Sequence, residues 1–125
     1  MAVQDDHMIR NIEDVGRLIA KLLLHEKMPS YTLPNDNADF SEADKLFQKV
    51  MDLAKNGEIN EAENTLYEGM QEDDVDYLEL ALTFYLYLND MDSDFLDDHG
   101  YSREEVLEGM KDLASDWGVT GLEAF

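Results

Sequence analysis

Residues 75–88 read VDYLELALTFYLYL, and this stretch decides the fold. On a helix of about 100° per residue, its polar side chains, Asp76, Glu79 and Thr83, fall in one wedge of about 60°. Apolar and aromatic side chains fill the other directions, so neighbouring elements must cover the helix on most sides. At about 1.5 Å per residue the helix is about 21 Å long, too short to span a bilayer. The stretch therefore predicts a central core helix, an interface helix, or both.

Length and composition predict one globular domain. A chain of 125 residues with 44% hydrophobic residues can bury a core large enough to fold without a metal or a disulfide. It has no cysteine, which excludes a disulfide framework, zinc thiolates and a cysteine nucleophile. We therefore expect a single domain over residues 1–125 that needs no cofactor. Within it, residues 29–40 are predicted to form a loop and residues 118–125 a tail.

The net charge of −21 is extreme and uneven. Residues 1–55 mix acids and bases, whereas residues 56–101 contain many acids and no Lys or Arg. Such a field repels phosphate backbones and anionic lipid heads, which argues against binding to nucleic acid or to a membrane. A solvated surface is the simplest interpretation of this charge, and a protein partner with a basic surface is the functional one.

The first residues, MAVQDDH, lack the apolar core of a secretory signal. No apolar run is long enough for a transmembrane helix. The absence of cysteine fits a reducing compartment. Together these features predict a cytoplasmic protein.

Apolar periodicity and capping signals predict five main helices. Ser102 with Glu105 forms a full capping box, and Ser41 with Asp44 forms a weaker one. A polar connector at residues 89–100, with a single docked turn, precedes the last helix. The predicted helices cover residues 8–25, 41–56, 58–70, 75–88 and 103–117.

The second and third predicted helices, Leu46–Met70, resemble one tetratricopeptide repeat. Val50 departs from that pattern, and no second copy follows, so the resemblance implies one closely packed hairpin rather than a peptide-binding array. We therefore expect an all-α, five-helix domain with this antiparallel hairpin packed on the central apolar helix. The positions that match the repeat are Gly57, Ile59, Ala62, Leu66 and Gly69.

Two longer stretches resemble a family of short, acidic, helical proteins of unknown function from Gram-positive bacteria. They are MIRNIEDVGRLIAKLL at residues 8–23 and FYLYLNDMDSDFLDDHGYSREEVLEGMKDLA at residues 84–114. The resemblance covers nearly the whole chain and implies an all-helical fold. It implies no activity, because none is assigned to that family.

Three acidic residues in the 89–100 connector have the alternate spacing of an EF-hand calcium loop. Phe95 stands where that loop needs a glycine, and Tyr101 stands where it needs a bidentate glutamate. An acidic capped loop is therefore the simpler interpretation, and we predict no metal site. The weak candidate ligands are Asp90, Asp92 and Asp94.

Glu104, Glu105 and Glu108 form an E-E-x-x-E motif. The motif resembles the magnesium site of helical nucleotide pyrophosphatases of the MazG type. Those enzymes add an E-x-x-D motif on a later helix, and none follows here. We therefore expect no enzyme, and a magnesium-dependent pyrophosphatase is the alternative.

The leading functional hypothesis is a non-enzymatic protein-interaction or assembly module that associates with itself. The first and central predicted helices offer more apolar surface than the remaining helices cover easily, and two-fold dimers are the commonest oligomers. An acidic mimic of nucleic acid is a further alternative. The predicted interface residues of the homodimer are Met8, Ile9, Ile12, Ile19, Leu23, Tyr77 and Tyr85.

Overall fold

The structure, a computed structural model, describes residues 3–125 and the side chains of residues 6–125. Within them the chain forms six α-helices and no strand, which confirms the predicted all-α class. A π-helical turn, η1 (Ala20–Leu24), continues the first helix, and a 3₁₀ turn, η2 (Asn37–Asp39), precedes the second. No helix in this part of the chain is long and apolar enough to cross a membrane. The α-helices are α1 (Val3–Ile19), α2 (Glu42–Lys55), α3 (Ile59–Gly69), α4 (Val75–Asn89), α5 (Ser93–Asp98) and α6 (Arg103–Asp116).

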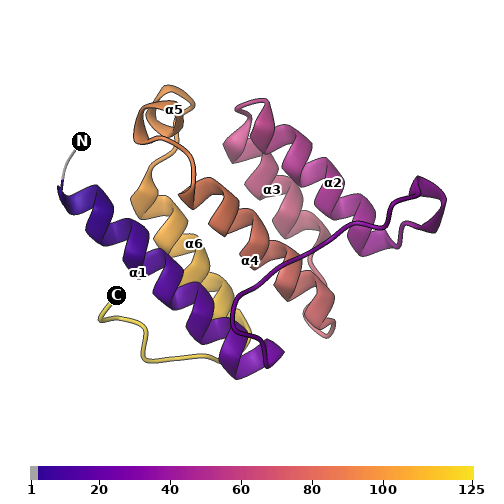
Figure 1. The fold of residues 1–125 in the computed structure, drawn as a ribbon, viewed down its shortest axis with the longest axis horizontal. Coiled ribbons are helices and arrows are strands. Elements are labelled where there is room, and N and C mark those ends of the chain that lie inside the picture. The colour runs from indigo at the N-terminus through magenta and orange to yellow at the C-terminus, as the bar shows by residue number, and fades with distance from the viewer. Residues whose placement is uncertain (1–2) are drawn as a thin grey trace.

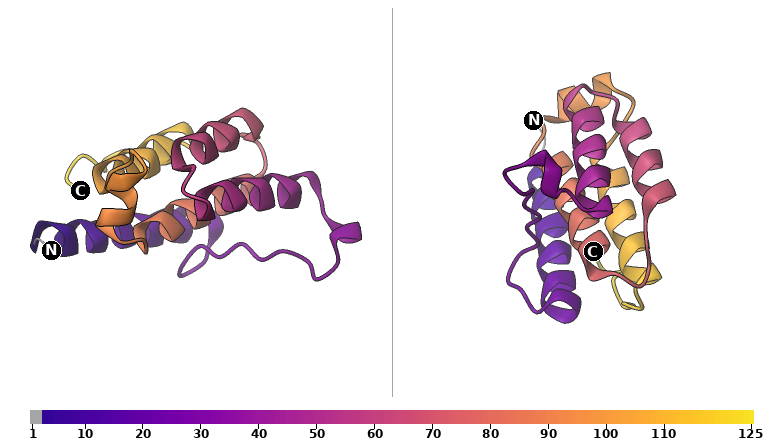
Figure 2. Two further views of the ribbon diagram at one scale, coloured as in Figure 1. Left: turned by 90° about the horizontal axis from the view of Figure 1, so that it is seen from above. Right: turned by 90° about the vertical axis from the view of Figure 1, so that its right-hand side faces the viewer.

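The helices form two layers around α4 (Figures 1 and 2). In one layer α4 lies between α1 and α2, and in the other α6 and α3 lie side by side beneath it. On the opposite face of α4, residues 25–41 run across the helix (Figure 1). We call this segment the strap. The stretch at residues 75–88 is thus the central core helix of a single chain, as its apolar pattern predicts.

Capping explains where the second and last helices begin. Ser41 Oγ accepts the Asp44 N–H at 3.1 Å, and Asp44 Oδ2 accepts the Ser41 N–H at 2.9 Å. Ser102 and Glu105 exchange the same two bonds at the start of α6. Each pair satisfies two backbone donors that a helix start would otherwise leave open. Both predicted capping boxes are confirmed.

The first helix and the connector differ from prediction. α1 begins at Val3 rather than Met8, because acidic residues such as Asp6 favour a first turn even without an apolar pattern. Its last turn widens into η1 and ends at His25, whose φ of 58° is left-handed. In the 89–100 connector, the expected single turn is the six-residue helix α5, so the described residues contain the five main helices that the sequence predicts and this short one.

The α2–α3 pair is a closely packed hairpin. Its turn contains Gly57 at a φ of 85°, a conformation that glycine adopts without strain. Ala62 is fully buried between the helices. At the far end, a Cβ on Gly69 would lie only 2.7 Å from the Leu46 side chain. Gly57 therefore permits the turn, and Gly69 lets α3 approach α2 at the far end of the hairpin.

Arg103, the first residue of α6, is a buried charge that joins α6 to the end of α4 and, through Asn89, to α1. Its Nη1 donates to the main-chain oxygen of Asn89 at 2.5 Å, and its Nη2 donates to that of Met91 at 2.6 Å. The Asn89 side chain in turn donates to the Ile9 carbonyl at 3.1 Å. These bonds satisfy carbonyls at the end of α4, where a positive charge also complements the helix dipole.

Candidate functional site

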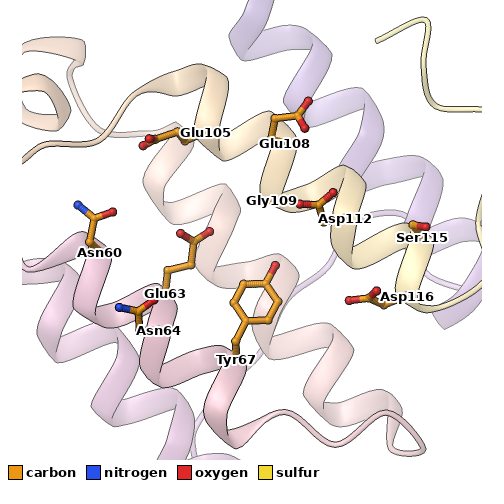
Figure 3. A pocket seen from close by; sticks show the side chains of 10 residues that line it. All are labelled: Asn60, Glu63, Asn64, Tyr67, Glu105, Glu108, Gly109, Asp112, Ser115 and Asp116. Carbon is orange, nitrogen blue, oxygen red and sulfur yellow. The ribbon is translucent and has the colours of Figure 1, made fainter.

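A cleft of about 590 Å³ lies between α3 and α6 (Figure 3). Its walls are polar, and carboxylates dominate them. None of the described residues that line it is Lys or Arg. We call this hollow the acidic cleft. Its carboxylate residues are Glu63 on α3 and Glu105, Glu108, Asp112 and Asp116 on α6.

Helical spacing places these side chains on facing walls. On α3, Asn60, Glu63 and Tyr67 lie three or four residues apart, which is one face of a helix. The cleft carboxylates of α6 repeat with the same spacing, opposite the buried face that holds Met110. In Figure 3, Glu63 and Tyr67 rise toward α6, and Asp112 stands on the other wall.

Two phenols hold Glu63 in position. Tyr85 Oη on α4 donates to Glu63 Oε2 at 2.6 Å, and Tyr101 Oη donates to the same oxygen at 3.0 Å. Tyr67 Oη lies 3.1 Å from Tyr85 Oη and extends the network toward solvent. Burial raises the pKa of both Tyr85 and Tyr101, and the neighbouring Glu63 raises each pKa further. Both phenols therefore remain neutral donors at neutral pH.

Gly109 makes this arrangement possible. A Cβ at this position would lie 2.5 Å from Cε1 and Cζ of the Tyr85 ring. Because glycine has no side chain, α6 lies directly on that ring, and the phenol reaches the floor of the cleft. The sequence offers no motif for Glu63, Tyr101 or Gly109, since the network joins residues far apart in the chain.

The cleft has the chemistry of a cation-binding surface. A carboxylate that is already oriented accepts charge-assisted hydrogen bonds from a guanidinium or ammonium group. Tyr67 is 40% exposed, so its ring is open to such a group as well. Lys111, the Lys of α6, is directed elsewhere, because its ammonium donates to the Phe125 carbonyl at 2.7 Å.

Comparison with known proteins gives one match. A family model described as a family of unknown function (DUF6483) matches residues 2–118. The chain belongs to this family. No curated protein and no solved structure matches it. Membership in the DUF6483 family agrees with the resemblance to an uncharacterised helical family, and it assigns no activity to the acidic cleft.

The candidate calcium ligands of this DUF6483 chain lie away from the cleft. Asp90 caps the end of α4, and Asp92 precedes α5. The side chains of Asp90, Asp92 and Asp94 are all exposed. Over residues 6–125, no three Asp, Glu or His side chains are grouped closely enough to hold a metal ion.

The three glutamates of the E-E-x-x-E motif lie in different environments. Glu105 Oε2 accepts the Ser102 N–H at 3.2 Å in the capping box, although the side chain also borders the cleft. Glu108 lines the acidic cleft, and Glu104 is exposed outside its lining. The structure therefore brings Glu105 and Glu108 to the cleft together with Glu63, a residue that the motif does not include.

The predicted interface residues fall into two groups by their exposure within one chain. Ile12, Ile19, Tyr77 and Tyr85 are at most 6% exposed, because α4 and its neighbours cover them within one chain. Met8, Ile9 and Leu23 are partly buried. An apolar pattern shows that a face must be covered, but not which element covers it. The large apolar side chains that stay exposed are Leu22, Met28, Tyr67 and Val75.

Proposed function

We propose that this protein is a non-enzymatic interaction module whose acidic cleft binds a basic segment of another protein. One observation carries the proposal: Glu63, on the α3 wall of the cleft, is fixed by two buried phenols and faces further carboxylates on α6. No Lys or Arg among the described lining residues neutralises them.

The energetics favour a cationic side chain over an isolated ion. Glu63 is already held by Tyr85 and Tyr101, so binding loses little additional side-chain freedom at that carboxylate. An Arg guanidinium can pair with Glu63 while its plane lies on the exposed Tyr67 ring. The carboxylates of α6 draw a basic segment toward the cleft over a distance of about 8 Å at physiological salt.

A peptide titration tests the proposal. Octa-arginine should bind the protein at about 50 mM salt, and isothermal titration calorimetry measures the affinity. Glu63→Gln with Asp112→Asn should weaken binding at least about tenfold, or about 1.4 kcal/mol, because both cleft walls lose a charge.

The matched control removes the same charge outside the cleft. Glu72→Gln with Asp73→Asn alters two exposed acids between α3 and α4 and should leave the affinity within about twofold. Equal weakening by both pairs of substitutions would show that the net charge binds the peptide, and the proposal would fail.

The magnesium-dependent enzyme is the alternative, because several carboxylates line one hollow, although no three of the described ones are grouped closely enough to hold a metal ion. We predict that calorimetric titration with calcium or magnesium shows no binding tighter than about 10⁻⁴ M. A micromolar site that Glu63→Gln abolishes would favour the enzyme, and one that Asp92→Asn abolishes would instead support the calcium loop.

Three further predictions belong to this proposal. The α2–α3 hairpin packs in the manner of a tetratricopeptide repeat, and its support is the close approach of Gly69 to Leu46, the burial of Ala62 and the left-handed turn at Gly57. The protein forms a homodimer, and it acts in the cytoplasm. An acidic mimic of nucleic acid remains a weaker alternative, because the carboxylates described above line a hollow rather than a convex face.

A further inference from the structure

A second pocket, of about 810 Å³, lies at the end of α1 and has the opposite charge. Arg17, Lys21, His25 and Lys27 line it together with Glu26 and Met28. The chain contains thirty acidic residues and only nine Lys and Arg, yet three of those nine border this one pocket. We call this surface the basic corner.

The local backbone builds the basic corner. The π-helical turn Ala20–Leu24 rotates its residues away from the α-helical pattern, and such turns are rare. His25 then turns the chain with a φ of 58°, an uncommon conformation for a residue with a side chain. Met28, which lines the pocket, is 36% exposed, so apolar surface adjoins the positive charges.

The charges of the corner are available to a partner. Arg17 Nη1 lies 3.2 Å from Asp14 Oδ1, but both side chains are about half exposed, and such pairs contribute little. Lys21, His25 and Lys27 are exposed. A cation at the C-terminal end of a helix complements the helix dipole, and this effect explains one or two of these basic residues.

We propose that the basic corner of one copy docks in the acidic cleft of a second copy. The inference rests on the proposed function, and it names the basic segment as part of this same chain. Charge complementarity selects this pairing, because corner against corner and cleft against cleft both bring like charges together. The two surfaces share no residue, so each copy offers both. A contact between two different surfaces of identical copies either closes into a ring or grows into an open chain of copies. The smallest closed form is a dimer in which the corner of each copy docks in the cleft of the other.

Charge-reversal variants of the full chain test the pairing by sedimentation equilibrium at micromolar concentration. One variant reverses the corner with Arg17→Glu and Lys21→Glu, and the other reverses the cleft with Glu108→Lys and Asp112→Lys. We expect the wild type to associate, each variant alone to be monomeric, and an equimolar mixture of the two to associate again. In the mixture the reversed corner meets the reversed cleft, and the unchanged corner meets the unchanged cleft, so both contacts are attractive. A general effect of net charge would not restore association in this way.

The control reverses two cations elsewhere. Lys45→Glu with Lys49→Glu changes the net charge as the corner variant does, on exposed positions of α2, and should keep the association. If the corner variant does not fold, as judged by circular dichroism, Arg17→Gln with Lys21→Gln takes its place. A monomeric wild type, a mixture that does not associate, or equal loss in the control each overturns the inference.

The octa-arginine titration separates this inference from the proposed function. If octa-arginine binds at the cleft while the wild type is monomeric, the cleft takes basic segments but the basic corner is not one of them. If octa-arginine does not bind and the wild type is monomeric, both proposals fail. A third outcome is that the corner variant is monomeric while the cleft variant still associates. The basic corner would then dock on another acidic surface, and this inference would fail.

Discussion

Gly109 is the residue on which the acidic cleft depends most directly. Alanine normally stabilises the middle of a helix by about 1 kcal/mol relative to glycine. Here its Cβ would lie 2.5 Å from the buried Tyr85 ring, which is tied to Glu63. We predict that Gly109→Ala lowers the free energy of unfolding by about 1–3 kcal/mol. Urea unfolding followed by the fluorescence of the single tryptophan, Trp117, measures this change.

Ser115→Ala is the matched control for this prediction. Ser115 is exposed on the same helix, so its replacement should change stability by no more than about 0.5 kcal/mol. Stability that is unchanged or higher in Gly109→Ala would mean that the Tyr85 ring moves aside, and Gly109 would lose its role in the cleft.

Single residues differ in how far the sequence predicts them. The capping roles of Ser41 and Ser102 depend on neighbours three positions away, so the local pattern contains them. The role of Glu63 depends on Tyr85 and Tyr101, which lie 22 and 38 positions away. Arg103 follows an N-cap, where an exposed side chain is expected, and no pattern predicts that it is buried on carbonyls of the α4–α5 turn.

The strap is the element whose attachment depends on pH. The Ser30 N–H donates to Glu79 Oε2 at 3.0 Å and fastens the strap to α4. Burial, followed by a hydrogen bond with the Glu26 carboxyl, raises the pKa of Glu79 above 4.5. The folded state therefore binds this proton more readily than the unfolded chain does. Stability is gained as pH falls through the raised pKa, and ionised Glu79 destabilises the fold at higher pH.

We predict that Glu79→Gln raises the melting temperature at about pH 7, because the amide removes the charge and still accepts the Ser30 N–H. The difference from the wild type should shrink as the pH falls through the raised pKa of Glu79, because the wild-type side chain then becomes protonated. Scanning calorimetry across this range measures it, with the exposed Glu68→Gln on α3 as the control. A difference that is constant with pH would show that Glu79 does not titrate differently on folding.

Whole helices were predicted better than their ends and connections. The apolar arc of residues 75–88 required cover on most sides, and α4 has it. For the strap the sequence predicts only a loop at residues 29–40, because loop residues such as Pro29 indicate a connection but not its course. The widened turn after Ile19 had no signal, since the apolar spacing of Leu22 and Leu23 fits an ordinary helix equally well.

At the scale of the whole molecule, repulsion between negative charges affects the stability of the fold. Two ion pairs occur among residues 6–125, Arg17–Asp14 and Lys45–Glu42, and both are exposed. Such pairs contribute little, whereas repulsion acts across the whole acidic surface. We therefore predict that the melting temperature rises from about 20 mM to about 0.5 M sodium chloride, because salt screens the repulsion.

Differential scanning fluorimetry measures this rise, and mild acidification should raise the melting temperature in the same direction before carboxylate protonation unfolds the chain. Potassium chloride at equal ionic strength is the control, since screening does not depend on the cation. A melting temperature that falls with salt would mean that ion pairs, rather than repulsion, dominate the native state.

The pairing of α1 with α6 has a consequence for synthesis on the ribosome. The first helix is made before any of its partners, and the helix that covers much of its apolar face is the last to emerge. Synthesis adds about 5–20 residues each second, so that face waits for several seconds in the nascent chain. The α2–α3 hairpin can close while it waits, because its contacts are local in sequence. The fold is therefore completed from its middle outward, and α1 and α6 pack together only after α6 has been made.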